Sequence, residues 1–188
     1  MRCFLALPLA DPALTAAARL QGALSSRVAD VRWARPETLH VTVHFFGEID
    51  DERVAVAVDA VLPLAADTET FAMALDSLGS FPPAGTPRVL WLGQSAENAA
   101  LTALAGRCQA ALRDGGFPVN VRPYRPHCTL GRPSRRWGAE GRAAWSSARA
   151  EQPEVMRWTA TRLVLYDSRS ARGGAVYTEQ AVLPFAAH

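Results

Sequence analysis

A four-residue pattern occurs twice in this chain of 188 residues, and it constrains the fold more than any other feature. Residues 40–43 read His-Val-Thr-Val, and residues 127–130 read His-Cys-Thr-Leu. The first copy belongs to a run of β-branched and aromatic residues that ends at Gly47, and such a run favours a half-buried strand over a helix. Two copies of one strand motif indicate two related lobes that face each other across a groove.

The strand period places the polar residues of each copy together. Alternate side chains of a strand share a face, so we expect His40, Thr42 and His44 on one face of the first strand. We expect His127 and Thr129 on one face of the second strand, with the apolar residues between them in a core. Two imidazoles and two hydroxyls around one small target are suited to general acid–base chemistry on a phosphodiester.

A structural role for each His is the alternative interpretation, because short motifs often match by chance. The duplication favours a functional role, since two of only four histidines head the same pattern. A metal site is disfavoured, because His40 and His44 on one strand would lie roughly 13 Å apart. No Cys-x-x-Cys pair is present, and no acidic residue adjoins either motif His. We therefore expect neither a metal nor another cofactor.

Five stretches, the two motifs included, carry a resemblance to a known family. They are residues 2–7, 39–47, 88–93, 125–132, and 165–168 with 173–174 and 177–178. In these stretches and their order, the chain resembles the 2H phosphoesterase superfamily, and within it the bacterial and archaeal RNA 2′,3′-cyclic phosphodiesterase, or 2′-5′ RNA ligase, family. It departs from that family at Gly131, where Ala is more common, and at Cys128, which occupies an aliphatic position. These departures leave the substrate preference open.

Helices and strands are mixed without strict βαβ alternation, which predicts an α+β fold with antiparallel sheets. The expected helices are residues 11–27, 50–62 and 95–113, with N-caps at Asp11, at Asp50 or Asp51, and at Ser95, and the second helix is ended by Pro63. The expected strands are residues 2–7, 39–46, 71–81, 87–93, the second motif, 156–167 and 175–183, with a loop or short helix over 134–150.

The resemblance also implies an architecture. In it, the fold is bilobal, and two antiparallel β-sheets with pseudo-twofold symmetry face a central groove. The helices pack on the outer faces of the sheets. Residues 1–188 then form a single 2H phosphoesterase domain made of two intertwined lobes.

Composition narrows the class of protein. No apolar run approaches the length of a membrane-spanning helix, and the N-terminus resembles a first strand and not a signal peptide. The chain has three cysteines, an odd number without framework spacing, which indicates reduced thiols. We therefore expect a cytoplasmic protein without membrane contact, and a monomer by default.

All 20 basic residues are arginine, and the formal net charge is +2. Arginine binds phosphate through a planar fork of donors. Six arginines crowd around the second motif, and they are Arg122, Arg125, Arg132, Arg135, Arg136 and Arg142. This cluster is either a solvated face or a track for RNA phosphates.

The resemblance implies roles for individual residues. His40 is the implied general acid, which protonates the 3′ leaving oxygen of a cyclic phosphate, and His127 is the implied general base, which activates water. Thr42, Thr129 and Arg132 are implied to bind the phosphate oxygens. The product is then a 2′-phosphomonoester. A 5′-hydroxyl in place of water gives 2′-5′ ligation without ATP.

Four more residues are candidate contacts to a base or ribose, and they are Phe4, Tyr166, His44 and Ser168. Aromatic rings such as Phe4 and Tyr166 stack on bases in single-strand recognition, although core packing is the alternative. His44 is expected at the edge of the groove, on the face of His40. Ser168 lies in the fifth matching stretch, where a role in a turn is the alternative.

The expected partner is RNA that ends in a 2′,3′-cyclic phosphate. One alternative keeps the chemistry and changes the substrate to a small cyclic phosphate, such as ADP-ribose 1″,2″-cyclic phosphate or a cyclic nucleotide. Another alternative is an RNA- or nucleotide-binding module that captures phosphate without turnover. The intact His-Thr pair in both motifs argues against this module. The arginine-rich flank favours RNA over a small ligand.

Overall fold

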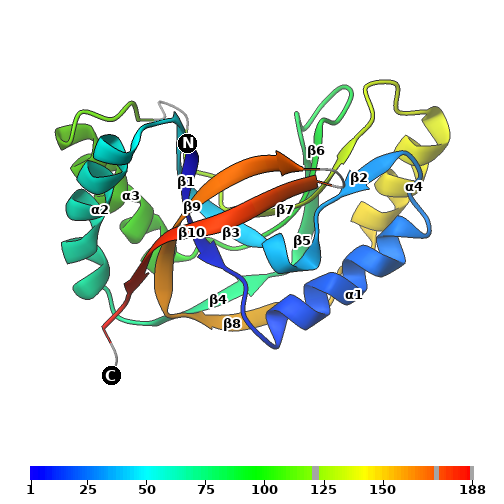
Figure 1. Cartoon of the computed structure of the whole chain (residues 1–188). Coiled ribbons are helices and arrows are strands. Elements are labelled where there is room, and N and C mark those ends of the chain that lie inside the picture. Colours follow the sequence, from blue (N-terminus) through cyan, green and yellow to red (C-terminus); the bar gives the residue numbers. More distant parts are fainter. Residues whose placement is uncertain (120–122, 172–173, 187–188) are drawn as a thin grey trace.

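The structure, a computed structural model, describes residues 1–119, 123–171 and 174–186 (Figure 1). The strands are β1 Arg2–Pro8, β2 Val31–Trp33, β3 His40–Glu48, β4 Phe71–Leu75, β5 Ser77–Phe81, β6 Val89–Gly93, β7 His127–Pro133, β8 Met156–Ala160, β9 Arg162–Ala171 and β10 Gly174–Pro184. The helices are α1 Ala13–Ser25, the 3₁₀ helix η1 Pro36–Thr38, α2 Asp51–Ala66, α3 Ala99–Asp114 and α4 Ala139–Ala150.

Eight of the strands form one antiparallel sheet in the centre of the molecule (Figure 1). Neighbouring strands follow the order β10-β9-β1-β3-β7-β6-β5, and β2 also pairs with β7. β4 and β8 form a second, two-stranded antiparallel sheet. The predicted α+β class with two antiparallel sheets is therefore confirmed.

The two motif strands meet in the middle of the large sheet. β3 and β7 pair antiparallel through one residue pair, Val41 with Cys128. An antiparallel pair has a local twofold axis, so rotation about this point relates the two copies of the motif. The large sheet thus has two halves, one ending in β3 and the other starting at β7. We call the face of the sheet that carries His40 and His127 the motif face.

Each motif strand contains a bulge at the same place. In β3, one extra residue lies between Thr42 and His44, opposite β1. In β7, one extra residue lies between Thr129 and Gly131, opposite β6. A bulge shifts the alternation of a strand by one residue, so the side chains beyond it change faces.

Helices cover the two ends of the sheet. Figure 1 shows α2 and α3 together at one end and α1 and α4 at the other. Within these ends, α2 packs on α3, α3 contacts β3, and α1 contacts β8. Apolar residues from both ends join one core cluster, which includes Leu5, Val41, Leu104 and Trp145. Each motif strand therefore has one face in the core and presents its His and Thr on the other.

The predicted strand over residues 71–81 is split at Asp76 into β4 and β5, which lie in different sheets. The Asp76 carboxylate accepts hydrogen bonds from the backbone N–H and the hydroxyl of Ser95, and this fixes the corner. Ser95 therefore does not cap α3. Asn98 is the cap instead, because its side-chain oxygen accepts from the N–H of Leu101.

Two other helix boundaries differ from the predicted ones. α2 passes through Pro63 and ends at Ala66, because the buried Val61 and Ala65 hold its last turn on the core. α1 begins at Ala13, and the Asp11 side chain accepts hydrogen bonds from Thr15 outside the usual capping position. The stretch 134–150, predicted as a loop or short helix, contains α4.

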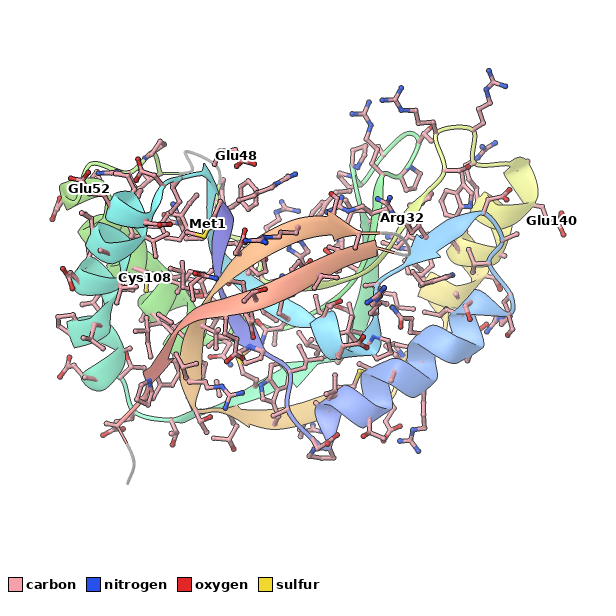
Figure 2. All side chains as sticks on the ribbon, in the orientation of Figure 1. Met1, Arg32, Glu48, Glu52, Cys108 and Glu140 are labelled. Carbon is pink, nitrogen blue, oxygen red and sulfur yellow. The ribbon has the colours of Figure 1, made fainter. Side chains whose placement is uncertain are left out.

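No helix in the described ranges combines the length and the apolar composition that crossing a membrane requires. All three cysteines lie in these ranges, and each is a buried free thiol. Figure 2 shows one of them, Cys108, at the α2–α3 end, whereas Arg32 and Glu140 lie at the end formed by β2 and α4.

Candidate active site

The two motif histidines are held in the same way. The Nδ1 atom of His40 lies 2.6 Å from the carbonyl oxygen of Thr38, and the Nδ1 atom of His127 lies 2.7 Å from that of Arg125. A carbonyl oxygen only accepts, so each Nδ1 carries a proton and donates it. The neutral ring then has its lone pair on Nε2. Each ring can therefore accept a proton at Nε2, or give one from there once it is protonated.

Burial lowers the pKa of both imidazoles. The pKa of His40 falls to about 4: desolvation is the largest cause, the hydrogen bond to Thr38 opposes it, and the charge of His127 adds to the lowering. Desolvation is also the largest cause of the lowered pKa at His127. The effect of the His127 charge on His40 shows that the two rings lie close enough to interact electrostatically. Both are neutral at pH 7 without a bound anion, and a bound anion raises both pKa values.

The motif threonines lie beside the histidines of the opposite motifs. The antiparallel register at the seam puts Thr42 next to His127 and Thr129 next to His40. Both threonines are half-buried. The hydroxyl of Tyr124 donates a hydrogen bond of 2.9 Å to the carbonyl oxygen of Thr42, which ties the segment before β7 to β3. Two hydroxyls and two imidazoles are thus gathered at the centre of the motif face.

Arg132 reaches the motif face because of the bulge in β7. Strict alternation from His127 would put Arg132 on the core face. The bulge instead pairs Gly131 with the buried Leu90 and returns Arg132 to the motif face. Burial is the largest cause of the shifted pKa at both His127 and Tyr177. The charge of Arg132 lowers both of these pKa values. The exposed guanidinium is therefore placed to meet an anion at the histidines.

Aromatic rings hold each imidazole in place. The His40 ring stacks on Phe4 with centroids 4.7 Å apart and meets Tyr177 edge-on at 5.3 Å. The His127 ring meets Phe81 edge-on at 4.9 Å. Tyr177 and Phe81 were not predicted as site residues from the sequence. Tyr177 lies on β10, with β9 and β1 between it and β3, and Phe81 lies on β5, with β6 between it and β7. Only the strand order of the folded sheet reveals their proximity to the histidines.

A family model for the 2′-5′ RNA ligase superfamily matches residues 9–172. The chain belongs to this superfamily. It is 33% identical over 154 residues to an RNA 2′,3′-cyclic phosphodiesterase from Geobacillus stearothermophilus, in a match that covers 82% of this chain and 45% of that protein. The chain thus spans less than half the length of that relative. A protein of the same name from Archaeoglobus fulgidus is 31% identical over 136 residues, covering 72% of this chain and 74% of the relative.

Solved structures share the fold along nearly the whole chain. A protein from Thermus thermophilus superposes with a TM-score of 0.78 at 25% identity, and the match covers 98% of each chain. Escherichia coli LigT, crystallised with 3′-AMP, also has a TM-score of 0.78, at 23% identity over 98% of this chain and 97% of LigT. The family resemblance and the fold class predicted from the sequence are confirmed.

His44 does not lie where strict alternation puts it. The bulge after Thr42 moves His44 to the core face, where it pairs with Leu5 and is 2% exposed. Its ring meets Phe46 edge-on at 4.7 Å, and neither ring nitrogen has a hydrogen-bond partner within the described part of the chain. The predicted contact at the groove edge is therefore wrong for His44. The next residue, Phe45, lies on the motif face and is exposed.

The remaining candidate base contacts differ in exposure. Phe4 is 4% exposed and packs on His40 and Tyr166, so it offers no face to a base and the prediction is wrong for this residue. Phe4 instead positions the His40 ring. Tyr166 is half-buried beside it, and Ser168 is half-buried opposite Tyr177 on the same face. Tyr166 and Ser168 remain candidate contacts.

A pocket of about 240 Å³ opens beside His40. Tyr166 and Tyr177 line it with their aromatic side chains, and Glu37 and Glu179 add carboxylates. Carboxylate oxygens accept hydrogen bonds from ribose hydroxyls and base amino groups. The pocket therefore suits a nucleoside attached to a phosphate at His40.

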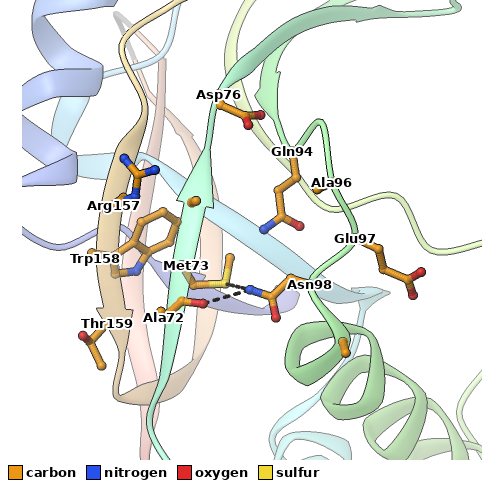
Figure 3. Close-up of a pocket in the computed structure, with 12 residues that line it drawn as sticks. Ala72, Met73, Asp76, Gln94, Ala96, Glu97, Asn98, Arg157, Trp158 and Thr159 are labelled. Atoms are coloured by element: carbon orange, nitrogen blue, oxygen red, sulfur yellow. Dashed lines mark hydrogen bonds between the residues drawn. The ribbon is translucent and has the colours of Figure 1, made fainter.

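A larger pocket, of about 600 Å³, lies between the β4–β8 sheet and the start of α3 (Figure 3). Gln94 and Asn98 line it together with charged side chains of both signs, namely Glu97, Asp76 and Arg157. Asn98 is engaged as the cap of α3. The site residues predicted from the sequence are not among those that line this pocket, so it is distinct from the candidate active site.

The arginine cluster around the second motif is only partly described. Arg122 lies outside the described residues, as does Gly173 of the fifth matching stretch. Arg125, Arg135 and Arg136 are exposed, in keeping with either a solvated face or a phosphate track. The exposed Arg142 donates a hydrogen bond to the carbonyl oxygen of Trp137.

Two other kinds of site, a metal site and a cysteine nucleophile, can be compared with the described residues. Within the described ranges, no three His, Cys, Asp or Glu side chains lie close enough together to hold a metal ion. Cys128 adjoins His127 in sequence, but its side chain points into the core. Burial raises the pKa of the Cys128 thiol to about 12, so it is not a nucleophile at neutral pH.

Proposed function

We propose that this protein is an RNA 2′,3′-cyclic phosphodiesterase. The observation that carries the proposal is the pair of imidazoles on the motif face. Each keeps its Nδ1 proton on a backbone carbonyl and so presents Nε2 for proton transfer. The names of the two relatives from Geobacillus stearothermophilus and Archaeoglobus fulgidus support the same activity.

In the proposed reaction, His127 is the general base and His40 is the general acid. Nε2 of His127 takes a proton from water, whose oxygen forms a bond to phosphorus. The bond from phosphorus to the 3′ oxygen breaks, and Nε2 of His40 gives its proton to that oxygen. The product is a 2′-phosphomonoester. In-line displacement needs the acid and the base on opposite sides of the phosphorus, and two strands related by a local twofold axis support that placement.

The phosphate oxygens are held by Thr42, Thr129 and Arg132. The two hydroxyls donate hydrogen bonds from the floor of the site, and the guanidinium adds a charge-assisted bond. These donors stabilise the charge that gathers on the non-bridging oxygens in the transition state. A phosphodiester has two non-bridging oxygens, and the two symmetry-related threonines provide one hydroxyl donor for each of them.

The acid role requires a protonated His40 when the substrate is bound. Desolvation lowers the pKa of His40 to about 4 in the absence of a ligand, which disfavours the imidazolium. A phosphodiester beside the ring carries the opposite charge, so it raises this pKa and brings a proton into the site. The substrate thus creates the protonation state that its own reaction needs.

The decisive experiment is hydrolysis of an RNA oligonucleotide that ends in a 2′,3′-cyclic phosphate, in excess EDTA, with the position of the product phosphate mapped. We expect rapid conversion to a 2′-phosphate. A 3′-phosphate product would overturn the direction of opening. Binding without turnover would instead favour the phosphate-binding module.

Ligation uses the same groups. When a 5′-hydroxyl replaces water, attack on the cyclic phosphate gives a 2′-5′ linkage without ATP. We expect ligation to be weaker than hydrolysis, because water is abundant and RNA ends are dilute. A ligation yield above the hydrolysis yield at micromolar RNA would contradict this expectation.

A small cyclic phosphate is the second candidate substrate, because the pocket beside His40 is only about 240 Å³. ADP-ribose 1″,2″-cyclic phosphate and cyclic nucleotides belong to this class. Salt dependence separates the two candidates. The affinity of the protein for RNA bound along an extended phosphate track should fall steeply as salt rises, and its affinity for a single small anion should fall weakly.

Three broader predictions accompany the function. Residues 1–188 act as one 2H phosphoesterase domain of two intertwined lobes, and the shared core cluster supports this. The protein works as a monomer. Its cytoplasmic location is supported by three buried free thiols, which are typical of a reducing compartment.

A further inference from the structure

Trp91 is a half-buried aromatic residue for which hydrolysis provides no role. The alternation of β6 points Leu90 and Leu92 into the core and Trp91 onto the motif face. Its strand partners are Thr129 on β7 and Gly79 on β5. The indole thus lies beside a motif threonine and outside the core.

Two glycines make room for this indole. A Cβ atom at Gly79 would lie 2.1 Å from ring atoms of Trp91, and a Cβ atom at Gly93 would lie 2.7 Å from its ring. Neither position accepts a side chain while the indole stays in place. The ring therefore lies against the backbone of its own strand and of β5. Its Nε1 atom has no hydrogen-bond partner within the described ranges.

Phe81 extends the aromatic surface toward His127. The Phe81 and Trp91 rings have centroids 5.3 Å apart and a tilt of 38°. Their centroids lie 4.9 Å and 6.3 Å from the His127 ring. We call these two side chains the Trp91 platform. It flanks the proposed base, whereas the pocket of Tyr166 and Tyr177 flanks the proposed acid.

Hydrolysis of a terminal cyclic phosphate needs only one nucleoside site. The nucleoside that carries the phosphate belongs beside His40, because that ring protonates its 3′ oxygen. The nucleophile arrives on the side of His127, and water needs no aromatic surface there. A second aromatic surface on this side suits a nucleophile that carries a base, since every base has a face that stacks on an aromatic ring.

We propose that the Trp91 platform binds the 5′-terminal nucleoside of an incoming RNA strand, whose 5′-hydroxyl attacks the cyclic phosphate. This inference rests on the proposed function and on its division of roles between the histidines. His127 takes the proton of the 5′-hydroxyl, and a bond forms between the 5′ oxygen and phosphorus. The bond from phosphorus to the 3′ oxygen breaks, and His40 protonates that oxygen. The product is a 2′-5′ phosphodiester, and no oxidant, reductant or nucleotide is consumed.

The test compares two reactions of the same variants. Trp91→Ala, Trp91→Phe and Phe81→Leu alter the platform, and Phe71→Leu is the matched control. Phe71 is also a half-buried strand residue, but it stacks on Phe185 at the small sheet. One assay measures hydrolysis of a 2′,3′-cyclic phosphate end. The other measures ligation of that end to a 5′-hydroxyl oligonucleotide, with the KM of the acceptor determined.

We expect Trp91→Ala to raise the acceptor KM roughly 5- to 100-fold, which is the range for loss of one base–aromatic stack. Hydrolysis by Trp91→Ala should change by less than about twofold, because the attacking water does not contact the indole. Trp91→Phe should recover most of the affinity for the acceptor, since it retains an aromatic face. Phe81→Leu should raise the acceptor KM less than Trp91→Ala does, and it should lower kcat of both reactions because Phe81 also packs on the His127 ring. Phe71→Leu should leave both reactions unchanged.

Each other outcome overturns a distinct statement. Equal losses of hydrolysis and ligation in Trp91→Ala, with Trp91→Phe intact, would make the residue structural and end the inference. An unchanged acceptor KM would also end it. A wild-type protein that hydrolyses the cyclic phosphate but forms no 2′-5′ linkage would refute the platform and leave the proposed function standing. A wild-type protein without hydrolysis would refute the proposed function itself.

Discussion

The two halves of the large sheet carry the same motif on the same backbone but surround it differently. Both histidines donate from Nδ1 to a carbonyl two residues earlier, and both strands bulge after the motif threonine. Beyond the bulge, the position on the core face is His44 in β3 and Gly131 in β7. The next position, on the motif face, is Phe45 in one half and Arg132 in the other.

The difference on the core face follows from what lies next to each position. The helix α3 packs next to β3, and the ring of His44 meets Phe46 edge-on. Next to β7, the strand β2 pairs in the same sheet, with Trp33 opposite Gly131. A Cβ atom at Gly131 would lie 2.7 Å from Val31 and 3.1 Å from Trp33, so β2 leaves no room for a side chain. This close approach explains why position 131 has Gly and not a residue with a Cβ atom.

The difference on the motif face affects the ligand. Thr42 has Ala6 as its partner on the neighbouring strand, whereas Thr129 has Trp91. The pocket of Tyr166 and Tyr177 lies beside His40, and the Trp91 platform lies beside His127. In the proposed function, the symmetric part of the site binds the phosphate, and the asymmetric part binds the groups attached to it.

The largest expected effect is the loss of either motif histidine. His40→Ala and His127→Ala should each reduce kcat for the cyclic phosphate about 10²- to 10⁴-fold, the usual contribution of general acid–base catalysis. The halves differ on bis(4-nitrophenyl) phosphate, whose leaving group departs without a proton. There His40→Ala should retain most of the wild-type rate and His127→Ala should not. Equal losses of both variants on both substrates, in steady-state kinetics, would contradict the division of roles.

The next effect tests the position after the bulge. Arg132→Ala should reduce kcat/KM roughly 10- to 100-fold, because a hydrogen bond to a charged group contributes about 1.5–3 kcal/mol. Phe45→Ala is the matched control at the equivalent place in β3, and it should change kcat/KM by less than about twofold. Equal losses of activity in both variants would show that the charge of Arg132 gives its half of the sheet no special role in binding the phosphate.

The pH profile tests the electrostatics that the halves share. In the proposed mechanism, only the form with one protonated histidine is active, and burial lowers both pKa values below the ordinary 6.5. This form is therefore lost at lower pH than for free histidine. Above the pKa at which it loses its proton, kcat/KM should fall by up to about tenfold per pH unit. In an NMR titration without ligand, the His40 ring should titrate at about 4. An unreactive phosphodiester should raise this pKa, and a titration unchanged by that anion would refute the proton uptake.

The smallest effect on activity is expected at His44. His44→Leu should change turnover by less than about twofold and should leave stability equal or higher, because a buried polar group without a partner is replaced by an apolar one. Burial lowers the folded-state pKa of His44, so its contribution to stability is present above pH 6.5 and is lost as pH falls below that value. Melting temperatures should show His44→Leu to be less sensitive to acid than the wild type. A large loss of turnover would place His44 on the motif face after all.

Several features follow from short-range patterns, and for these the sequence was sufficient. The alternation within residues 40–43 and 127–130 put His40 with Thr42 and His127 with Thr129 on one face, and the register agrees. The mixture of helices and strands predicted the α+β class. These features depend on backbone geometry that repeats every two or every 3.6 residues, so neighbours in the sequence determine them.

The rest depended on contacts between segments far apart in the chain. A bulge arises from pairing with another strand, so it cannot be predicted from a local sequence pattern. The core position of His44 and the motif-face position of Arg132 both depend on such a bulge. Phe4 could have stacked on a base or packed in the core, but its ring lies against His40 and Tyr166 on the motif face and is 4% exposed. From the sequence, Trp91 is an ordinary aromatic residue of a strand. In the structure, Gly79 on β5 and Gly93 on β6 leave room for its indole to lie against the backbone on the motif face. Local periodicity sets which residues share a face, but only the packing of distant segments sets which face is buried and where the alternation shifts.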